Sequence, residues 1–155
     1  MISLQNISLK RKYFAGILNF VTNITWQEQN PLHNGEGVRI MADCIFCKIA
    51  QKEIPSTLVY EDELVAAFKD LEPQAPFHAL VIPKKHVESI AALKAEDKEL
   101  AAHILCDVIP QIAKEQGLDE KGFRVVANTG EEGGQTVKHL HFHILGGRSM
   151  QWPPG

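Results

Sequence analysis

The chain has 155 residues, of which 45% are hydrophobic and 23% are charged, and its formal net charge is −3. These values are typical of a single domain that buries a proper core. The slightly acidic balance excludes the basic field that recruits nucleic acid, and no apolar run approaches the roughly 20 residues that span a bilayer. We therefore expect no nucleic-acid or membrane partner.

The N-terminal segment, residues 1–40, differs from the remainder. A basic cluster at 10–12 precedes a mostly apolar run at 13–21, and Met41 then opens a self-consistent sequence. We interpret 1–40 as an N-terminal extension, either disordered or a non-native upstream leader. An organellar presequence and an ordered arm are the alternatives. The domain is expected over 41–155.

The rest of the chain alternates short strand patterns with two helical patterns. In chain order we first predict a short helix over 43–49, capped by Asp43 and stopped by Pro55, and then strands over 58–60, 64–69 and 78–82. A helical turn over 88–93 and a long helix from about 96 to Gly117 follow. The chain ends with strands over 123–127 and 138–145 and an extended tail. Pro110 should kink the long helix, and His103 on it should be solvated. This order indicates an α+β fold with a five-stranded antiparallel sheet, one long helix and one short helix.

The last predicted strand carries three histidines that alternate with apolar residues: His139, His141 and His143. A period of two places all three imidazoles on one face of a strand. These histidines could form a metal site or a phosphate-transfer site, or they could simply lie on the solvated face of a strand. On a straight strand the outer Cα atoms lie about 13 Å apart, so the three side chains can hardly meet one ion.

A glycine-rich loop, Gly133-Gly134-Gln135-Thr136, precedes these histidines. Backbone amides in such loops approach anions closely, and Gln135 and Thr136 add side-chain donors. Anion donors beside an unpaired imidazole favour phosphoryl transfer, with His141 as the nucleophile and His143 as a donor to a phosphate oxygen. Without the histidines, a hairpin turn would be the preferred interpretation of the two glycines.

A second metal hypothesis comes from Cys44 and Cys47, which have Cys-x-x-Cys spacing. Together with His86 and His139 they could form a closed structural zinc site. Buried free thiols or a redox pair are the alternatives. The third cysteine, Cys106, makes the count odd, which argues against a disulfide framework and for a reducing compartment such as the cytoplasm.

The run His139-Leu140-His141-Phe142-His143-Ile144-Leu145 matches the histidine-triad (HIT) motif in full, and the resemblance extends from about Asp43 to Gly155. The chain most resembles the Hint branch, the nucleoside phosphoramidases. The supporting stretches are 45–49, 68–76, 80–86, 133–136 and 146–155. The Fhit-like branch usually follows its triad with Pro-Arg, whereas this chain has Gly146-Gly147-Arg148.

The resemblance implies a homodimer whose two five-stranded sheets join, and a hydrolase that cleaves the P–N bond of purine nucleoside 5′-phosphoramidates through a nucleotidyl-histidine. No cofactor would be required for catalysis. The resemblance implies that the base is enclosed by Phe46, Ile49, Phe68 and Leu71, and that Asp70 binds the ribose. It implies that the phosphate is held by Asn128, Gly134, Gln135, Thr136, His141 and His143. It also implies that His78 and His139 orient the nucleophile or relay protons to it, and that Trp152 reaches the partner's site.

Two departures from the Hint pattern bear on this assignment. Thr136 stands where Ser is common, so the hydroxyl that would protonate the leaving group is kept. A zinc ion on His139 would prevent that residue from relaying protons, and His78 would then carry the task. Hydrolysis of aminoacyl-adenylates or dinucleoside polyphosphates, and a non-catalytic nucleotide-binding module, are the alternative functions.

Overall fold

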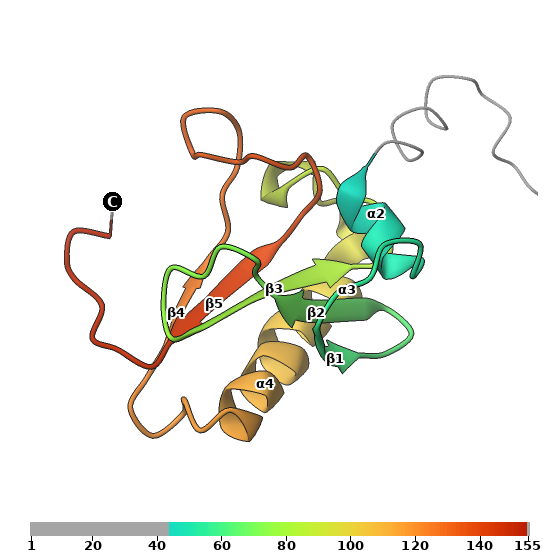
Figure 1. Cartoon of the computed structure of the whole chain (residues 1–155). Helices are drawn as coiled ribbons and strands as arrows, with labels where there is room; N and C mark the ends of the chain where they lie inside the picture. Colours follow the sequence, from blue (N-terminus) through green and yellow to red (C-terminus); the bar gives the residue numbers. More distant parts are fainter. Residues whose placement is uncertain (1–43, 155) are drawn as a thin grey trace, which may run out of the picture. The chain divides into compact units, whose positions relative to one another are not determined.

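The structure is a computed structural model that describes residues 44–154 (Figure 1). The predicted extension over 1–40 and the predicted cap Asp43 lie outside the described residues. Within 44–154, no helix is long and apolar enough to cross a membrane.

A five-stranded sheet forms the centre of the described region, as predicted. Its order is β1-β2-β3-β5-β4, and every neighbouring pair is antiparallel. The strands are β1 (Leu58–Glu61), β2 (Val65–Lys69), β3 (Phe77–Pro83), β4 (Arg124–Val126) and β5 (Phe142–Gly146). The first four begin and end within two residues of the predicted positions.

The two faces of the sheet carry separate cores, because successive side chains on a strand alternate between faces. Val65, Ala67 and Val81 belong to a large core with the long helix. Ala66, Phe68, Leu80 and Ile82 belong to a smaller core with Phe46 of α2 (Ile45–Ala50). Figure 1 shows α3 and α4 crossing the sheet, with α2 near one end of it. The α2 face carries the candidate site.

The long helix passes Pro110 by changing its hydrogen-bond spacing. It consists of α3 (Lys98–His103), a π-helical segment η3 (Ile104–Val108) and α4 (Ile109–Glu115), preceded by 3-10 turns at Ile90–Ala92 and Ala95–Asp97. Pro110 therefore lies in the first turn of α4, where its missing N–H is not needed, and the wider π turn gives its ring room.

Both helical regions end with the same backbone motif. Gly117 has φ +65° and Leu118 N–H donates to the Ala113 carbonyl at 2.8 Å. At the end of α2, Lys52 has φ +63° and Glu53 N–H donates to the Lys48 carbonyl at 2.9 Å. Both are Schellman caps. The prediction that Pro55 stops the first helix was wrong, because this cap ends α2 at Ala50.

The predicted strand over 138–145 is only half formed. β5 begins at Phe142, while His139 lies in a bend and His141 is outside the strand. The reason is the lack of a sheet partner, since the pairing of β3 with β5 begins at Val81 and Phe142. Leu140 N–H instead donates to the Val87 carbonyl at 2.6 Å. The three histidines therefore do not share one strand face.

Candidate functional site

Four predicted metal ligands meet in one place, which we call the metal cluster: Cys44, Cys47, His86 and His139. The His139 Nδ1 atom lies 3.4 Å from Cys44 Sγ, 3.5 Å from Cys47 Sγ and 3.2 Å from His86 Nδ1. Cys47 Sγ lies 3.3 Å from His86 Nδ1. Tetrahedral zinc with ordinary bond lengths separates its ligand atoms by roughly 3.3–3.8 Å. The four side chains therefore fit a structural zinc ion.

The protonation of these ligands also suits a cation. The His139 Nε2–H group donates to the Pro83 carbonyl at 2.9 Å, which leaves a lone pair on Nδ1 facing the cluster. Burial, with smaller contributions from nearby His86 and His141, lowers the pKa of His139 to about 4 and keeps it neutral. Burial and the neighbouring Cys44 raise the pKa of the Cys47 thiol to about 12. A thiolate at that position therefore needs a positive charge beside it.

A second group, which we call the relay cluster, contains Asp70, His78 and His143. The Gln74 backbone N–H donates to His78 Nδ1 at 3.2 Å, so the proton of neutral His78 is on Nε2. That proton points to His143 Nδ1 at 2.8 Å, with Asp70 Oδ2 at 3.4 Å. His143 consequently carries its own proton on Nε2, where it can donate to a ligand.

Both histidines of the relay cluster are neutral near pH 7. Burial lowers the pKa of His78, and the charge of Asp70 only partly opposes this. Burial, followed by the charges of His141 and His78, lowers the pKa of His143 to about 4. The 2.8 Å nitrogen separation is that of a hydrogen bond and is shorter than tetrahedral metal coordination allows. The relay cluster is therefore arranged for proton positioning.

The predicted nucleophile, His141, lies in the sequence between His139 of the metal cluster and His143 of the relay cluster. Its Nδ1–H group donates to the His139 carbonyl at 2.6 Å, so the lone pair of the neutral ring is on Nε2. The residue is 3% exposed. Its ring packs edge-on against Phe46 at a centroid distance of 5.3 Å and lies 5.0 Å from the ring of His143. An imidazole held by one nitrogen and bare at the other can act as a nucleophile.

The prediction that His139 relays protons to His141 is not supported by this geometry. One ring nitrogen of His139 donates to Pro83 and the other faces the metal cluster. Only its backbone carbonyl contacts His141. His78 is likewise placed against His143 rather than directly against His141. Sequence reasoning did not identify Gln74 N–H or the Pro83 carbonyl, because a backbone partner leaves no signal in residue type.

The side chain of Gln135, a predicted phosphate donor, is engaged in hydrogen bonds with the backbone around the loop. Its side-chain amide donates to the Glu88 and Val137 carbonyls at 2.7 and 3.0 Å and accepts from Gly130 N–H at 3.0 Å. The backbone N–H groups of Gly134 and Gln135 donate within the loop as well. Gln135 therefore shapes the glycine-rich loop. Gly133 is required there, because a Cβ atom would lie 2.3 Å from the Thr129 carbonyl oxygen.

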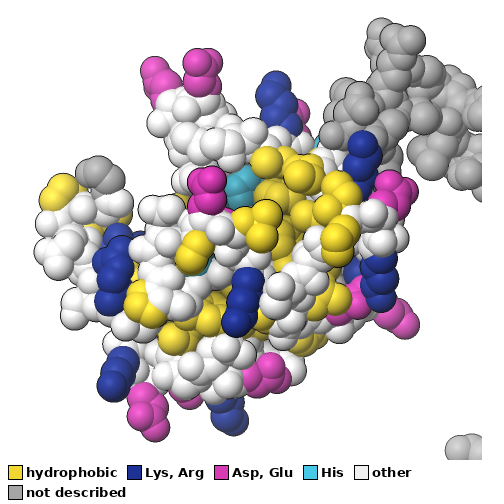
Figure 2. Space-filling view, viewed as in Figure 1, with side chains coloured by type: hydrophobic (Ala, Val, Ile, Leu, Met, Phe, Trp, Pro, Cys, Tyr) yellow, Lys and Arg dark blue, Asp and Glu magenta, His cyan; other side chains and the backbone are white. Residues whose placement is uncertain are grey.

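The residues expected around a base are only partly assembled. Phe46 and Phe68 are buried and pack edge to face at 5.7 Å, and Ile49 packs beside them. Leu71 and Trp152, in contrast, are 97% and 84% exposed. Thr136 is exposed and Asn128 is half-buried. Figure 2 shows a small histidine surface bordered by hydrophobic side chains on this face of the molecule.

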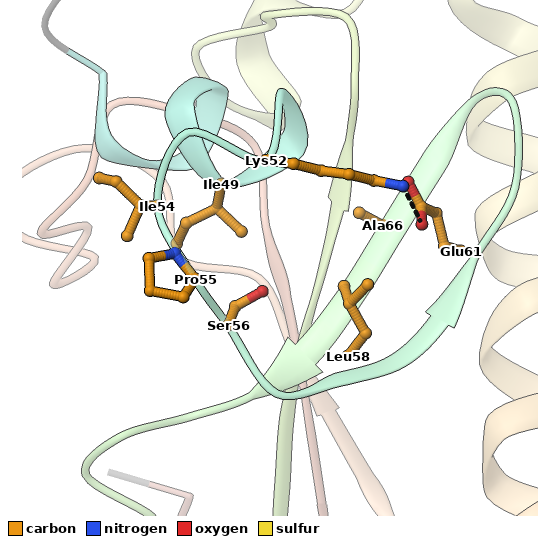
Figure 3. A pocket seen from close by; sticks show the side chains of 8 residues that line it. All are labelled: Ile49, Lys52, Ile54, Pro55, Ser56, Leu58, Glu61 and Ala66. Carbon is orange, nitrogen blue, oxygen red and sulfur yellow. Dashed lines mark ion pairs between the residues drawn. The ribbon is translucent and has the colours of Figure 1, made fainter.

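A hollow of about 170 Å³ was not predicted from the sequence. It is lined by Ile49 and Ile54, by Pro55 and Ser56, and by side chains of β1 and β2 (Figure 3). Lys52 and Glu61 pair across its rim, with Nζ and Oε2 3.0 Å apart. Ile49 connects this hollow to the aromatic pair of the smaller core.

Comparison with known proteins agrees with this site. A family profile described as the HIT domain matches residues 51–150. A HIT-like protein of Synechococcus elongatus is 54% identical over 113 residues, which cover 73% of this chain and 97% of that protein. The 14 kDa zinc-binding protein of Zea mays is 52% identical, covering 72% and 87% of the two chains.

Solved structures give the same result. The HIT family hydrolase from Legionella pneumophila has a TM-score of 0.71 and 52% identity, over 73% of this chain and all of that chain. A histidine triad protein from Clostridium difficile has a TM-score of 0.68 and 56% identity, over 70% and 94% of the two chains. With a profile match over more than half of its length and relatives more than 50% identical, the chain belongs to the HIT family.

Proposed function

We propose that the protein is a hydrolase that cleaves the P–N bond of purine nucleoside 5′-phosphoramidates through a covalent nucleotide on His141. The observation that carries this proposal is the hydrogen bond from His141 Nδ1–H to the His139 carbonyl, which leaves the Nε2 lone pair free for attack. The similarity to a HIT family hydrolase supports the general class of reaction.

The first step joins His141 to phosphorus. Nε2 attacks, the P–N bond breaks, and the amine leaves with a proton passed through the Thr136 hydroxyl and replaced from water. The ring becomes positively charged, and the His139 carbonyl stabilises the Nδ1–H side of it. His143 donates its Nε2–H to a phosphate oxygen without carrying a net charge, and His78 holds it in that tautomer.

The second step restores the enzyme. Water attacks phosphorus on the open face, the bond from phosphorus to Nε2 breaks, and the nucleoside monophosphate leaves with the oxygen of water. The proton of water passes to solvent, and His141 returns to its neutral form. The overall reaction consumes one water and yields one amine and one nucleotide.

Substrate binding and assembly follow from the family resemblance and form part of the proposal. Phe46, Ile49, Phe68 and Leu71 would enclose the base, Asp70 would bind the ribose hydroxyls, and Asn128 would help to hold the phosphate. A homodimer would bring Trp152 to the partner's site, which suits a side chain that is 84% exposed in one chain. We place the HIT domain at 41–155 and the reaction in the cytoplasm.

Base-quenched mass spectrometry with an adenosine phosphoramidate tests this proposal. Wild-type protein should carry one adenylyl group on His141, and H141A should bind nucleotide but form no adduct. H103Q is a matched histidine control outside the site and should label like wild type. Turnover of H141A at the wild-type rate would reject the proposal, and nucleotide binding without any turnover by wild-type protein would favour a binding module. If a dinucleoside polyphosphate labels His141 faster than the phosphoramidate does, dinucleoside polyphosphates become the proposed substrate class instead.

A further inference from the structure

We propose that His139 is a positioning residue that couples the metal cluster to the nucleophile. In this view the metal ligands, besides stabilising the fold, fix the tautomer and position of His141 through the His139 backbone carbonyl. The inference rests on the proposed function, since it assigns His141 as the nucleophile.

The contacts of His139 support this role. The residue is 0% exposed, and its ring is fixed at both nitrogens, by the Pro83 carbonyl at 2.9 Å and by the two thiols and His86. Its carbonyl accepts the His141 Nδ1–H at 2.6 Å. The ring that faces the metal cluster and the carbonyl that holds the nucleophile therefore belong to one immobilised residue.

The sheet does not hold this part of the chain. β5 begins at Phe142, after the nucleophile, and Lys138 on the other side is exposed. The backbone anchor of this stretch to the rest of the fold is the bond from Leu140 N–H to the Val87 carbonyl, and Val87 directly follows the ligand His86. The Leu140 side chain is buried in the large core, and the backbone around His141 is fastened through His139 of the metal cluster and through Val87, which adjoins it.

A second contact links the cluster to the nucleophile. Phe46 lies between the two cysteines in the sequence, and its ring packs edge-on against His139 at 5.9 Å and against His141 at 5.3 Å. Cys44 and Cys47 hold α2 at the cluster, and this places Phe46 against the nucleophile. Loss of a metal ligand would loosen the carbonyl contact and the aromatic contact together.

The expected chemical consequence is a change of tautomer. Without the His139 carbonyl, neutral His141 can move its proton to Nε2, and the ring then has no lone pair to direct at phosphorus. Loss of partners that orient a reactive imidazole or a ligand typically costs roughly 10- to 100-fold. We expect a loss of this size in the rate of adenylylation, with nucleotide affinity unchanged within about twofold.

The test compares C44S, which removes a ligand, with C44H, which supplies another. C106S is the matched control, because Cys106 is exposed and lies on η3, whose buried residues belong to the large core on the other face of the sheet. Three quantities are measured on folded protein: zinc content, the rate of single-turnover adenylylation, and the ¹⁵N chemical shifts of the His141 ring, which report its tautomer. C44S should lose zinc, the Nδ1–H signature and the rate together, and C44H should regain all three.

A folded, zinc-free C44S protein that keeps the Nδ1–H tautomer and the wild-type rate would overturn the inference. If C44S does not fold, wild-type protein loaded with Co²⁺ provides the second test. Because coupling is reciprocal, adenylylation of His141 should shift the cobalt absorption bands, and bands unchanged by stoichiometric adenylylation would overturn the inference. A wild-type protein that forms no adduct would reject the proposed function alone, since the tautomer measurement needs no substrate.

Discussion

The metal cluster and the relay cluster each contain two histidines, one of which, His139 or His143, lies two residues from His141 in the sequence. In the metal cluster the ligand atoms lie 3.2–3.5 Å apart and the Nδ1 lone pairs converge, so a cation satisfies them. In the relay cluster the His78 and His143 nitrogens lie 2.8 Å apart and share a proton.

The difference originates in backbone partners. Pro83 provides a carbonyl, which requires a proton on His139 Nε2 and leaves Nδ1 as a ligand atom. Gln74 provides an N–H, which requires a lone pair on His78 Nδ1 and places its proton toward His143. His139 is thus set up for metal binding and His78 for proton donation, because the backbone partner of the first is an acceptor and that of the second is a donor. Stability should depend mainly on the first cluster, and proton donation to the substrate on the second.

The largest expected effect is on stability. C47S removes a buried metal ligand, and we expect the free energy of unfolding to fall on the order of 3–5 kcal/mol, because metal binding contributes directly to folding. Urea unfolding of zinc-loaded protein measures this. C106S, at an exposed thiol, should change stability by no more than about 0.5 kcal/mol. Equal midpoints for the two variants would contradict the assignment of the metal cluster.

The opposite pattern is expected for the relay cluster. H143A removes the Nε2–H donor, so kcat should fall roughly 10²- to 10³-fold, as for other donors to a charged transition state. Zinc content should be unchanged, because His143 lies outside the metal cluster. Steady-state kinetics and metal analysis on one preparation give both values. A variant that loses zinc in proportion to its activity would show that the two clusters are not separable.

The dependence of stability on pH provides a third test. The pKa of His143 is lowered from 6.5 to about 4, so above pH 6.5 the residue is neutral in both the folded and unfolded states. As the pH falls from 6.5 towards 4, the unfolded chain gains a proton that the folded chain does not, and stability declines. H143Q should lose less stability than wild type between pH 7 and 4.5. Zinc release at low pH is common to both proteins, so parallel curves would contradict the neutral assignment.

Much of the fold could be predicted from the sequence, because it depends on side-chain periodicity. The alternation that places Val65 and Ala67 on one face and Ala66 and Phe68 on the other is local information. The prediction for the first half of the last strand was wrong, because strand formation also depends on a partner that is distant in the sequence. Residues 139–141 alternate correctly, but a strand also needs a neighbour, and β3 offers one only from Phe142 onward.

The same limit applies to the candidate site. The residue types of the metal cluster were predicted, because thiols and imidazoles at such spacing have few other uses. The loop contacts of Gln135 were not, since a side-chain amide can bond a phosphate or a backbone carbonyl equally well and the sequence does not show which partner is near. The tautomers of His78, His139 and His141 depend on single backbone groups and lie beyond any pattern of residue types.

The smallest expected effect concerns His103, which the sequence suggested to be solvated. The structure places its two nitrogens 2.7 Å from Asp62 and 2.9 Å from Asp107, and hydrogen bonds to these two carboxylates raise its pKa. The folded state therefore holds the proton more tightly than the unfolded state. The resulting stability is fully present below pH 6.5 and is lost as the pH rises through the raised pKa, whereas the contribution of His143 has the opposite dependence on pH.

H103Q should cost ~0.2–1 kcal/mol at pH 6 and less at pH 9, as expected for a partly exposed ion pair. Urea unfolding of both proteins at the two pH values measures the difference, and a larger cost at pH 9 would contradict it. Because this histidine touches neither cluster, its variant should also leave zinc content and adenylylation unchanged, which separates a charged surface contact from the two neutral histidine pairs at the site.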